Sequence, residues 1–192
     1  MIRSPAVAVL ALLAAACTTP PLRPLAPADL PDRWQAQGRL AVRAGDEAWH
    51  GTFAWQQEAD RTRITLAGPL GQGSVSLRED AAGALLETGE GETVRGADTE
   101  ALLEQRLGWT LPVRGLRYWI TGRADPGRPA TWRRDPPPGA IALEQDGWTI
   151  ACDRFTAVDD GRVPQRVVLE RTDLRVRLVV DRWRLGAAAD GG

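Results

Sequence analysis

The sequence predicts a mainly β fold, a curved antiparallel sheet of the barrel or sandwich type, with one helical insert. Three observations indicate it. Apolar and polar residues alternate in successive segments from Trp34 onward, as in half-buried strands. Gly and Pro, 20 and 14 of the 192 residues, supply turn signals between these segments, at the spacing typical of barrels and sandwiches. Between residues 98 and 122 the apolar spacing changes to that of helices. Because most connections are short, we expect antiparallel pairing.

The N-terminal segment, residues 1–16, has the features of a secretory signal peptide. Its one charge is Arg3, and residues 5–16 are uncharged. That stretch is too short for a bilayer span, which needs about 20 residues, and it fits the apolar region of an exported precursor. The small residues before Cys17 resemble a lipobox, in which the cysteine becomes the lipidated N-terminus. A plain signal peptide with an incidental Cys17, or an uncleaved anchor, remains an alternative.

Residues 17–31 are expected to form a lipidated N-terminus and a Pro-rich tether. Four prolines within residues 18–27 exclude a helix or a central strand. Such a spacer extends by about 3 Å per residue, so it would hold the folded part close to a membrane. Thr18 follows the cysteine, and in lipoproteins that resemblance implies export to the outer membrane.

The folded domain is expected to span residues 32–185. In its first strand, residues 34–43, apolar or small residues occupy alternate positions, and polar residues occupy most of the others. Further strands are expected at residues 49–56, 62–66 and 75–77, with two more short strands near Gly83 and residues 89–91.

Two helices are expected next. Asp98 is a suitable N-cap, and an apolar stripe after it ends at Gly108. The second begins at Pro112 and ends before Gly122. A proline-rich loop follows, with at most a short strand around Trp132.

The C-terminal part returns to strands. They are expected at residues 141–144, 148–155, 167–170 and 174–185, and the last is long and clearly alternating. Residues 186–192, rich in Ala and Gly, are expected to be a flexible tail.

The composition excludes several classes of function. A net charge of −1 gives no overall basic field that would recruit nucleic acid. One His and two Cys exclude most His/Cys metal sites and a disulfide framework, so we expect no metal and no cofactor apart from the lipid on Cys17. His50 is interpreted as a surface histidine, Cys152 as a buried, inert thiol, and the acidic pairs at 79–80 and 159–160 as solvated turns. No catalytic set is apparent, and the protein is not expected to be an enzyme.

Eight Trp against two Phe and one Tyr form the other unusual feature. Trp and Leu recur on the apolar face of most expected strands and in the insert. The pattern alone favours a packed core, although a barrel of about ten strands can also enclose a ligand cavity. Leu70, in the turn of residues 68–73, is either exposed for membrane or partner contact or folded onto the sheet edge.

In combination, these segments resemble the LolB family of outer-membrane lipoproteins, which receive lipoproteins and insert them. The resemblance covers nearly the whole mature chain. It is carried by an ordered set of short motifs following the lipobox: Trp34 with Gly38-Arg39-Leu40-Ala41-Val42, Phe53-x-Trp55, Ile64-x-Leu66-x-Gly68-Pro69-Leu70-Gly71, Leu107-Gly108-Trp109-x-Leu111-Pro112-Val113, Leu116-x-Tyr118-Trp119-Ile120-x-Gly122, Gln145-Asp146-Gly147-Trp148, Pro164, and Leu-Val-Val-Asp-x-Trp at 178–183.

The resemblance implies an incomplete antiparallel β-barrel enclosing a hydrophobic cavity, with the helical insert as its lid. It also implies a monomer that faces the periplasm, a soluble LolA-like carrier as partner, acylated lipoproteins as cargo, and Leu70 as the residue that inserts into outer-membrane lipid. The candidates for the cavity wall are Trp34, Phe53, Trp55, Leu66, Trp109, Trp119, Ile120 and Trp148. A scaffolding envelope lipoprotein with a filled core is the alternative. Whether the outward arginines contact an acidic surface stays open.

Overall fold

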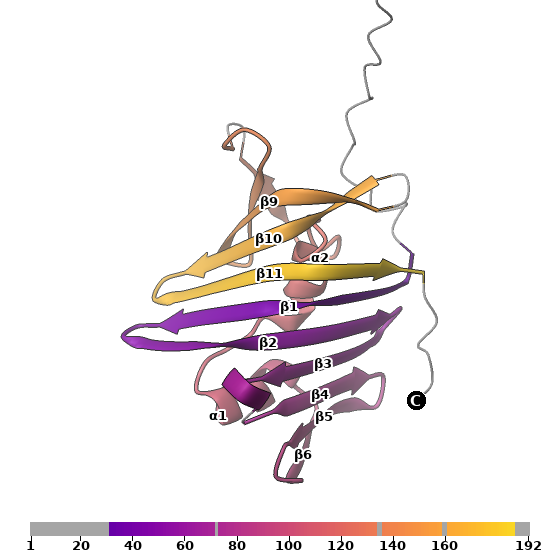
Figure 1. Ribbon diagram of the computed structural model, residues 1–192, viewed down its shortest axis with the longest axis vertical. Coiled ribbons are helices and arrows are strands. Elements are labelled where there is room, and N and C mark those ends of the chain that lie inside the picture. Colours follow the sequence, from indigo (N-terminus) through magenta and orange to yellow (C-terminus); the bar gives the residue numbers. More distant parts are fainter. Residues whose placement is uncertain (1–30, 72, 134–135, 159–160, 187–192) are drawn as a thin grey trace, which may run out of the picture.

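The structure, a computed structural model, describes residues 31–71, 73–133, 136–158 and 161–186 (Figure 1). Within these ranges, eleven strands form one antiparallel sheet in the order β6-β5-β4-β3-β2-β1-β11-β10-β9-β8-β7. The sheet is therefore open, and β6 and β7 are its edges. Its strands are β1 (Arg33–Ala44), β2 (Glu47–Glu58), β3 (Arg61–Ala67), β4 (Val75–Asp80), β5 (Gly83–Thr88), β6 (Thr93–Gly96), β7 (Ala130–Trp132), β8 (Ile141–Gln145), β9 (Trp148–Val158), β10 (Gly161–Arg171) and β11 (Leu174–Leu185).

The two faces of the sheet differ in the way that the alternating sequence predicts. In β1, Trp34, Ala36, Leu40 and Val42 are buried, whereas most of the residues between them are exposed. The same two-residue pattern recurs in β3 and in most of β11. A curved sheet with one apolar face must cover that face, because apolar side chains left in water cost about 25 cal/mol per Å².

The helical insert supplies this cover. Helices α1 (Thr99–Leu107) and α2 (Val113–Trp119) lie behind the sheet in Figure 1, on its concave side. As expected, Asp98 caps α1, since its carboxylate accepts hydrogen bonds from two backbone N–H groups, those of Glu100 and Ala101. Gly108 ends α1 in the left-handed conformation, with φ of 77°. Helix α1 packs against β5 and β6.

The predicted boundary of β10 was wrong. We expected this strand to begin at Val167, whereas it begins at Gly161 and includes Pro164. Strand β10 pairs with β11 only from Arg166 onward, so Pro164 has a hydrogen-bonded neighbour, β9, on one side only. A proline tolerates this position because its missing N–H removes no ladder bond there. The two strands diverge toward the right of Figure 1, where Trp183 Nε1 donates to Pro164 O at 2.9 Å.

The structure confirms the mainly β, antiparallel and open architecture with its helical insert. The other strand and helix predictions agree to within a few residues. The predictions for the signal peptide, for Cys17 and the tether up to residue 30, and for tail residues 187–192 lie outside the described residues. Among the described residues no helix is long and apolar enough to cross a membrane.

Candidate functional site

The concave face of the sheet, covered by α1 and α2, is the candidate site. The eight side chains proposed from the sequence for a cavity wall come from the sheet and from the insert. All of them are buried, none more than 8% exposed: Trp34, Phe53, Trp55, Leu66, Trp109, Trp119, Ile120 and Trp148. All eight belong to one continuous apolar cluster. The structure thus brings these residues together between the sheet and the helices.

Aromatic contacts mark both ends of this concave face. At the start of β1, the ring of Trp34 lies 5.6 Å from that of Trp55 and 5.6 Å from that of Trp183. At the opposite end of the strands, Trp49 lies 6.2 Å from Trp109, which follows α1. Centroid separations of this size are those of favourable tilted aromatic pairs. The Trp49–Trp109 contact therefore joins the helical insert to the start of β2.

Two buried glutamines form hydrogen bonds with two tryptophans of this face, Trp119 and Trp55. Gln145 accepts from Trp119 Nε1 at 2.7 Å and from the backbone N–H of Asp125 at 2.9 Å. Its amide nitrogen donates to Asp125 O and Arg128 O. Gln57 accepts from Trp55 Nε1 at 3.1 Å and from the Thr62 hydroxyl at 2.9 Å. Each indole N–H thus has a partner, which is what allows a Trp to be buried without a large penalty.

The Pro-Leu-Gly turn lies on the opposite, outer face. It forms a short 3₁₀ turn, Pro69–Gly71, closed by a hydrogen bond from Gly71 N to Gly68 O at 3.1 Å. In Figure 1 this turn lies in front of β3, away from the helices. The backbone of Leu70 is part of the turn, but its side chain lies outside the described part of the structure. A groove of about 430 Å³ runs beside the turn, between Pro69 and the outward residues of β1, β2 and β11.

His50 and Cys152, the two other side chains considered for chemistry, lie on different strands, β2 and β9. His50 is exposed on β2, as expected. Cys152 is fully buried on β9 and donates to Trp119 O at 3.5 Å, and burial, with a smaller contribution from Asp153, raises the pKa of its thiol far above its ordinary value. A thiol so disfavoured as thiolate is a poor nucleophile. Within the described ranges, no group of three or more His, Cys, Asp or Glu is arranged to hold a metal.

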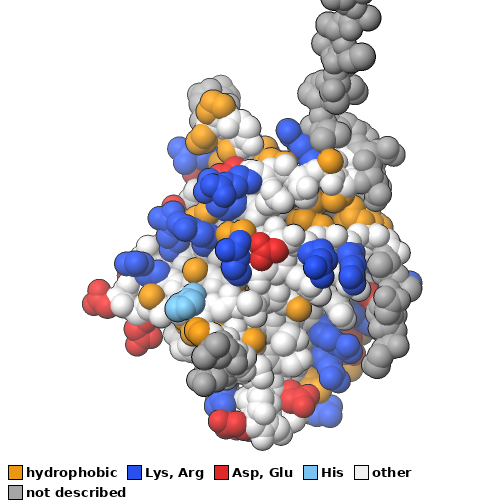
Figure 2. Space-filling view, viewed as in Figure 1, with side chains coloured by type: hydrophobic (Ala, Val, Ile, Leu, Met, Phe, Trp, Pro, Cys, Tyr) orange, Lys and Arg blue, Asp and Glu red, His pale blue; other side chains and the backbone are white. Residues whose placement is uncertain are grey.

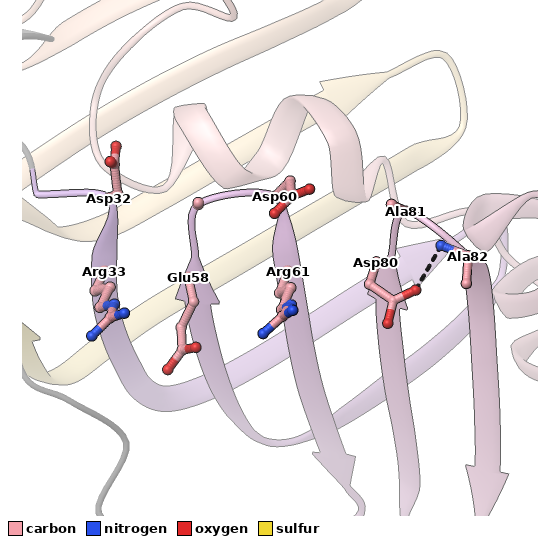
Figure 3. A pocket seen from close by; sticks show the side chains of 9 residues that line it. Asp32, Arg33, Glu58, Asp60, Arg61, Asp80, Ala81 and Ala82 are labelled. Atoms are coloured by element: carbon pink, nitrogen blue, oxygen red, sulfur yellow. Dashed lines mark hydrogen bonds between the residues drawn. The ribbon is translucent and has the colours of Figure 1, made fainter.

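A polar hollow of about 460 Å³ lies where strands β1 to β4 meet their turns (Figure 3). It is lined by carboxylates and arginines, among them Asp32, Glu58, Arg61 and Asp80. Asp80 accepts a hydrogen bond from the backbone N–H of Ala82 at 2.8 Å, which stabilises the turn itself. We interpret this hollow as a solvated turn, which fits the prediction for Asp80, whereas Glu79 is half-buried within β4 and does not line the hollow. The pair at 159–160 lies outside the described residues.

Sequence reasoning missed the two glutamines and misjudged one tryptophan. Gln145 and Gln57 occupy inward positions of alternating strands, so a polar residue at an expected core position was the available signal. Trp132 was counted among the tryptophans in or beside apolar strands and helices; the expected short strand around it is present as β7, but the side chain is 50% exposed at this edge. Strand β7 has three residues and pairs only with β8, so its burial is not set by alternation.

The family model and the curated relatives indicate one family. A family model described as "Outer membrane lipoprotein LolB" matches residues 32–183. The outer-membrane lipoprotein LolB of Nitrosococcus oceani is 40% identical over 154 residues, which cover 80% of this chain and 77% of that protein. LolB of a Marinomonas species is 34% identical over 180 residues, 90% of this chain and 93% of the relative. A solved LolA superfamily protein from Nitrosomonas europaea, 11% identical, gives a TM-score of 0.47 over 83% of this chain and 88% of that one, a likeness too low to establish a common fold.

Proposed function

The chain belongs to the LolB family of outer-membrane lipoproteins, and from this premise we propose that it accepts acylated lipoproteins from a LolA-like periplasmic carrier and inserts them into the outer membrane. It acts at the outer membrane as a lipid-anchored protein. We further propose that Cys17 carries the anchoring lipid, that the domain works as a monomer, and that cargo acyl chains bind between the sheet and the helical insert. No bond to the cargo is made or broken in this role.

The observation that carries the proposal is the continuous apolar surface shared by the sheet and the two helices. Each CH₂ group of an acyl chain moved out of water contributes about 0.8 kcal/mol. A cargo with several acyl chains therefore cannot cross the aqueous periplasm unshielded. A protein that offers an apolar face and then releases the chains into a bilayer gives them a downhill route without nucleotide hydrolysis.

The packing of this face suggests how acyl chains enter. Because the candidate side chains are buried against one another, chains take their place only when the insert moves away from the sheet. The two helices of the insert are attached to the sheet by contacts of unequal strength. Helix α2 is tied to β8 and β9 through Trp119, whereas α1 contacts β5 and the edge strand β6. We propose that the α1 side opens.

A transfer assay tests the proposal. Vesicles bearing the full lipidated protein are mixed with a LolA-like carrier that holds a fluorescent triacylated lipoprotein, and cargo in the vesicle fraction is measured. Transfer is expected with these vesicles, and not with protein-free vesicles or with cargo that lacks acyl chains. In parallel, an acylated cysteine peptide at 100 times its Kd should stabilise the protein by about 2.7 kcal/mol. Neither transfer nor stabilisation would favour a scaffolding lipoprotein with a filled core.

Leu70 is proposed as the residue that enters the bilayer during release, in keeping with its position in an outward turn. Leu70→Glu should retain binding of the acylated peptide but lose insertion of cargo into vesicles. Gln72→Glu adds the same charge two residues further along and serves as the control. Normal insertion by Leu70→Glu would show that the turn has no part in release.

A further inference from the structure

The outer face of the sheet is strongly basic although the whole chain has a net charge of −1. Arginines occupy exposed, outward positions of β1, β3, β4 and β11. They are Arg33, Arg39, Arg43, Arg61, Arg63, Arg78, Arg175, Arg177, Arg182 and Arg184. The acidic residues facing the same way on these strands and on β2 are Glu58, Asp80 and Asp181. Figure 2, which views this face, shows basic side chains spread across it and acidic ones mostly near its margins.

Two arginine pairs face each other directly across neighbouring strands. Arg43 on β1 is paired with Arg175 on β11, and Arg63 on β3 with Arg78 on β4. Like charges at directly opposite positions destabilise a sheet. A fold that keeps two such pairs on one face gains stability when an anion lies over them. The pairing thus points to an anionic ligand independently of the number of arginines.

Carboxylates of the sheet neutralise part of this charge only. Arg39 pairs with Asp181 at 2.9 Å, and Arg175 pairs with Glu170 at 3.0 Å. Within the described part of the chain, Arg43, Arg63, Arg78 and Arg177 form no ion pair. Each is exposed on the outer face, so its guanidinium remains available to an external partner.

The groove beside the Pro69–Gly71 turn lies within this basic area. Arg39 and Arg177 line it together with His50, and apolar groups, among them Ala41 and Val179, complete its wall. An apolar floor with guanidinium groups beside it matches an amphiphile that has an anionic head. A guanidinium binds phosphate oxygens in bidentate fashion and suits this task better than an ammonium group.

We propose that the outer face of β1 to β4 and β11 lies against anionic phospholipid headgroups, with the groove beside the turn receiving one of them. The inference rests on the proposed function, because a protein anchored to a membrane by its N-terminus always has lipid headgroups within reach. It also fixes an orientation. The convex face meets the bilayer, and the helical insert points toward the periplasm, where a carrier would arrive.

Lipid-quencher accessibility at two engineered thiols tests this orientation. The full lipidated protein is placed in phosphatidylcholine vesicles with or without phosphatidylglycerol, and an environment-sensitive fluorophore is attached at Ala41→Cys in the groove. Ala101→Cys, on the exposed side of α1, is the matched control. Cys152 is buried and does not react. We expect quenching by brominated lipid at position 41 only, dependent on phosphatidylglycerol and weakened by salt.

The arginines are tested in the same vesicles. Each cation near an anionic surface strengthens binding about fivefold, so Arg63→Gln with Arg177→Gln should lower the equilibrium constant for face contact about 25-fold. Arg106→Gln with Arg114→Gln, on the two helices, should leave it unchanged.

Three results would overturn the inference. They are equal quenching at positions 41 and 101, quenching at position 41 that does not depend on phosphatidylglycerol, and shielding of position 41 only when the carrier protein is added. The last would assign the face to an acidic protein. Cargo transfer is measured alongside. Normal transfer without face contact would refute the orientation alone, and face contact without transfer would refute the proposed function alone.

Discussion

Trp119 shows how one residue joins the helical insert to the sheet. Its indole N–H donates to Gln145 on β8 at 2.7 Å, its carbonyl accepts from the Cys152 thiol on β9 at 3.5 Å, and its ring lies 6.4 Å from that of Trp148. Both partner groups are fully or almost fully buried. The anchorage of α2 therefore depends on polar contacts inside an apolar cluster, where unpaired groups are costly.

Gln145→Leu tests this anchorage. The variant leaves Trp119 Nε1 and the backbone groups of residues 125 and 128 without partners. Each buried unsatisfied group costs about 1–3 kcal/mol, so we expect the free energy of unfolding in urea to fall by about 3 kcal/mol. Gln56→Leu, an outward position on β2, is the control and should stay within about 0.5 kcal/mol. Equal losses in both variants would mean that the Gln145 bonds are not the cause.

Cys152 should make stability depend on pH in the alkaline range. Burial raises the pKa of this thiol in the folded protein, whereas the unfolded value is about 8.5. Above that pH the unfolded chain has lost the proton and the folded one has kept it, so the free energy of unfolding falls as pH rises. Between pH 7.5 and 9.5 the loss should be about 1.4 kcal/mol. The contribution of Cys152 is measured by comparing urea unfolding of the wild type and of Cys152→Ala across this pH range. If the unfolding free energies of the two proteins fell in parallel with pH, the prediction would be contradicted.

At the scale of elements, the sequence of α2 leaves room for the Trp119 ring to pack directly against the backbone of the same helix. A Cβ added at Gly115 would lie 2.5 Å from two ring carbons of Trp119. Glycine in a helix interior costs about 1 kcal/mol relative to alanine. That cost is accepted here because the close approach lets Trp119 reach Gln145.

Gly115→Ala should therefore destabilise the protein even though alanine favours helix. The added methyl displaces the Trp119 ring and weakens its bond to Gln145, an overpacking effect of about 1–3 kcal/mol that outweighs the gain of about 1 kcal/mol in propensity. Arg114→Ala, at the exposed neighbouring position, should change stability by less than about 0.5 kcal/mol. Thermal unfolding of the two variants measures the difference. A more stable Gly115→Ala protein would show that the ring has room to move.

Element boundaries also show where prediction from the sequence succeeds and fails. Period-two alternation identified β1, β2 and β11, because one face of each meets an apolar cluster and the other meets water. Capping residues identified α1 for an equally local reason. The start of β10 was missed because proline usually interrupts a strand. Pro164 is tolerated within β10 because β11, which begins ten residues later, does not pair with β10 at this position. The role of Gln145 was missed since its partners come from other segments, and that of Gln57 because its contacts with Trp55 and Thr62 depend on the geometry of the β2–β3 hairpin.

At the scale of the whole molecule, the sheet separates two kinds of surface. Its concave face gathers the apolar and aromatic residues under the helices, and its convex face gathers arginines. The net charge of −1 concealed this separation. A sequence reveals which strand positions share a face, but the joining of β1 to β11 across the sheet, which creates the Arg43–Arg175 pair, comes only from the complete topology.

If cargo enters between the insert and the sheet, fixing α1 to the sheet edge should stop transfer. An ideal Cβ at Gly96 on β6 lies 3.1 Å from Leu102 Cγ on α1, so Gly96→Cys with Leu102→Cys places two thiols within bonding reach. The oxidised protein should transfer acylated cargo at least about tenfold more slowly than wild type, an effect of about 1.4 kcal/mol on the barrier. Reduction should restore transfer in the same sample, which excludes misfolding as the cause.

A second disulfide provides the control. Ala54→Cys with Thr65→Cys joins opposite residues of β2 and β3 on the outer face, where no opening is expected. This disulfide should leave transfer unchanged whether oxidised or reduced. Undiminished transfer by the oxidised α1–β6 protein, with the bond verified by mass, would mean that the chains enter elsewhere. The divergence of β10 from β11, spanned by the hydrogen bond between Trp183 and Pro164, would then be the next place to constrain, because the ladder between these two strands begins at Arg166.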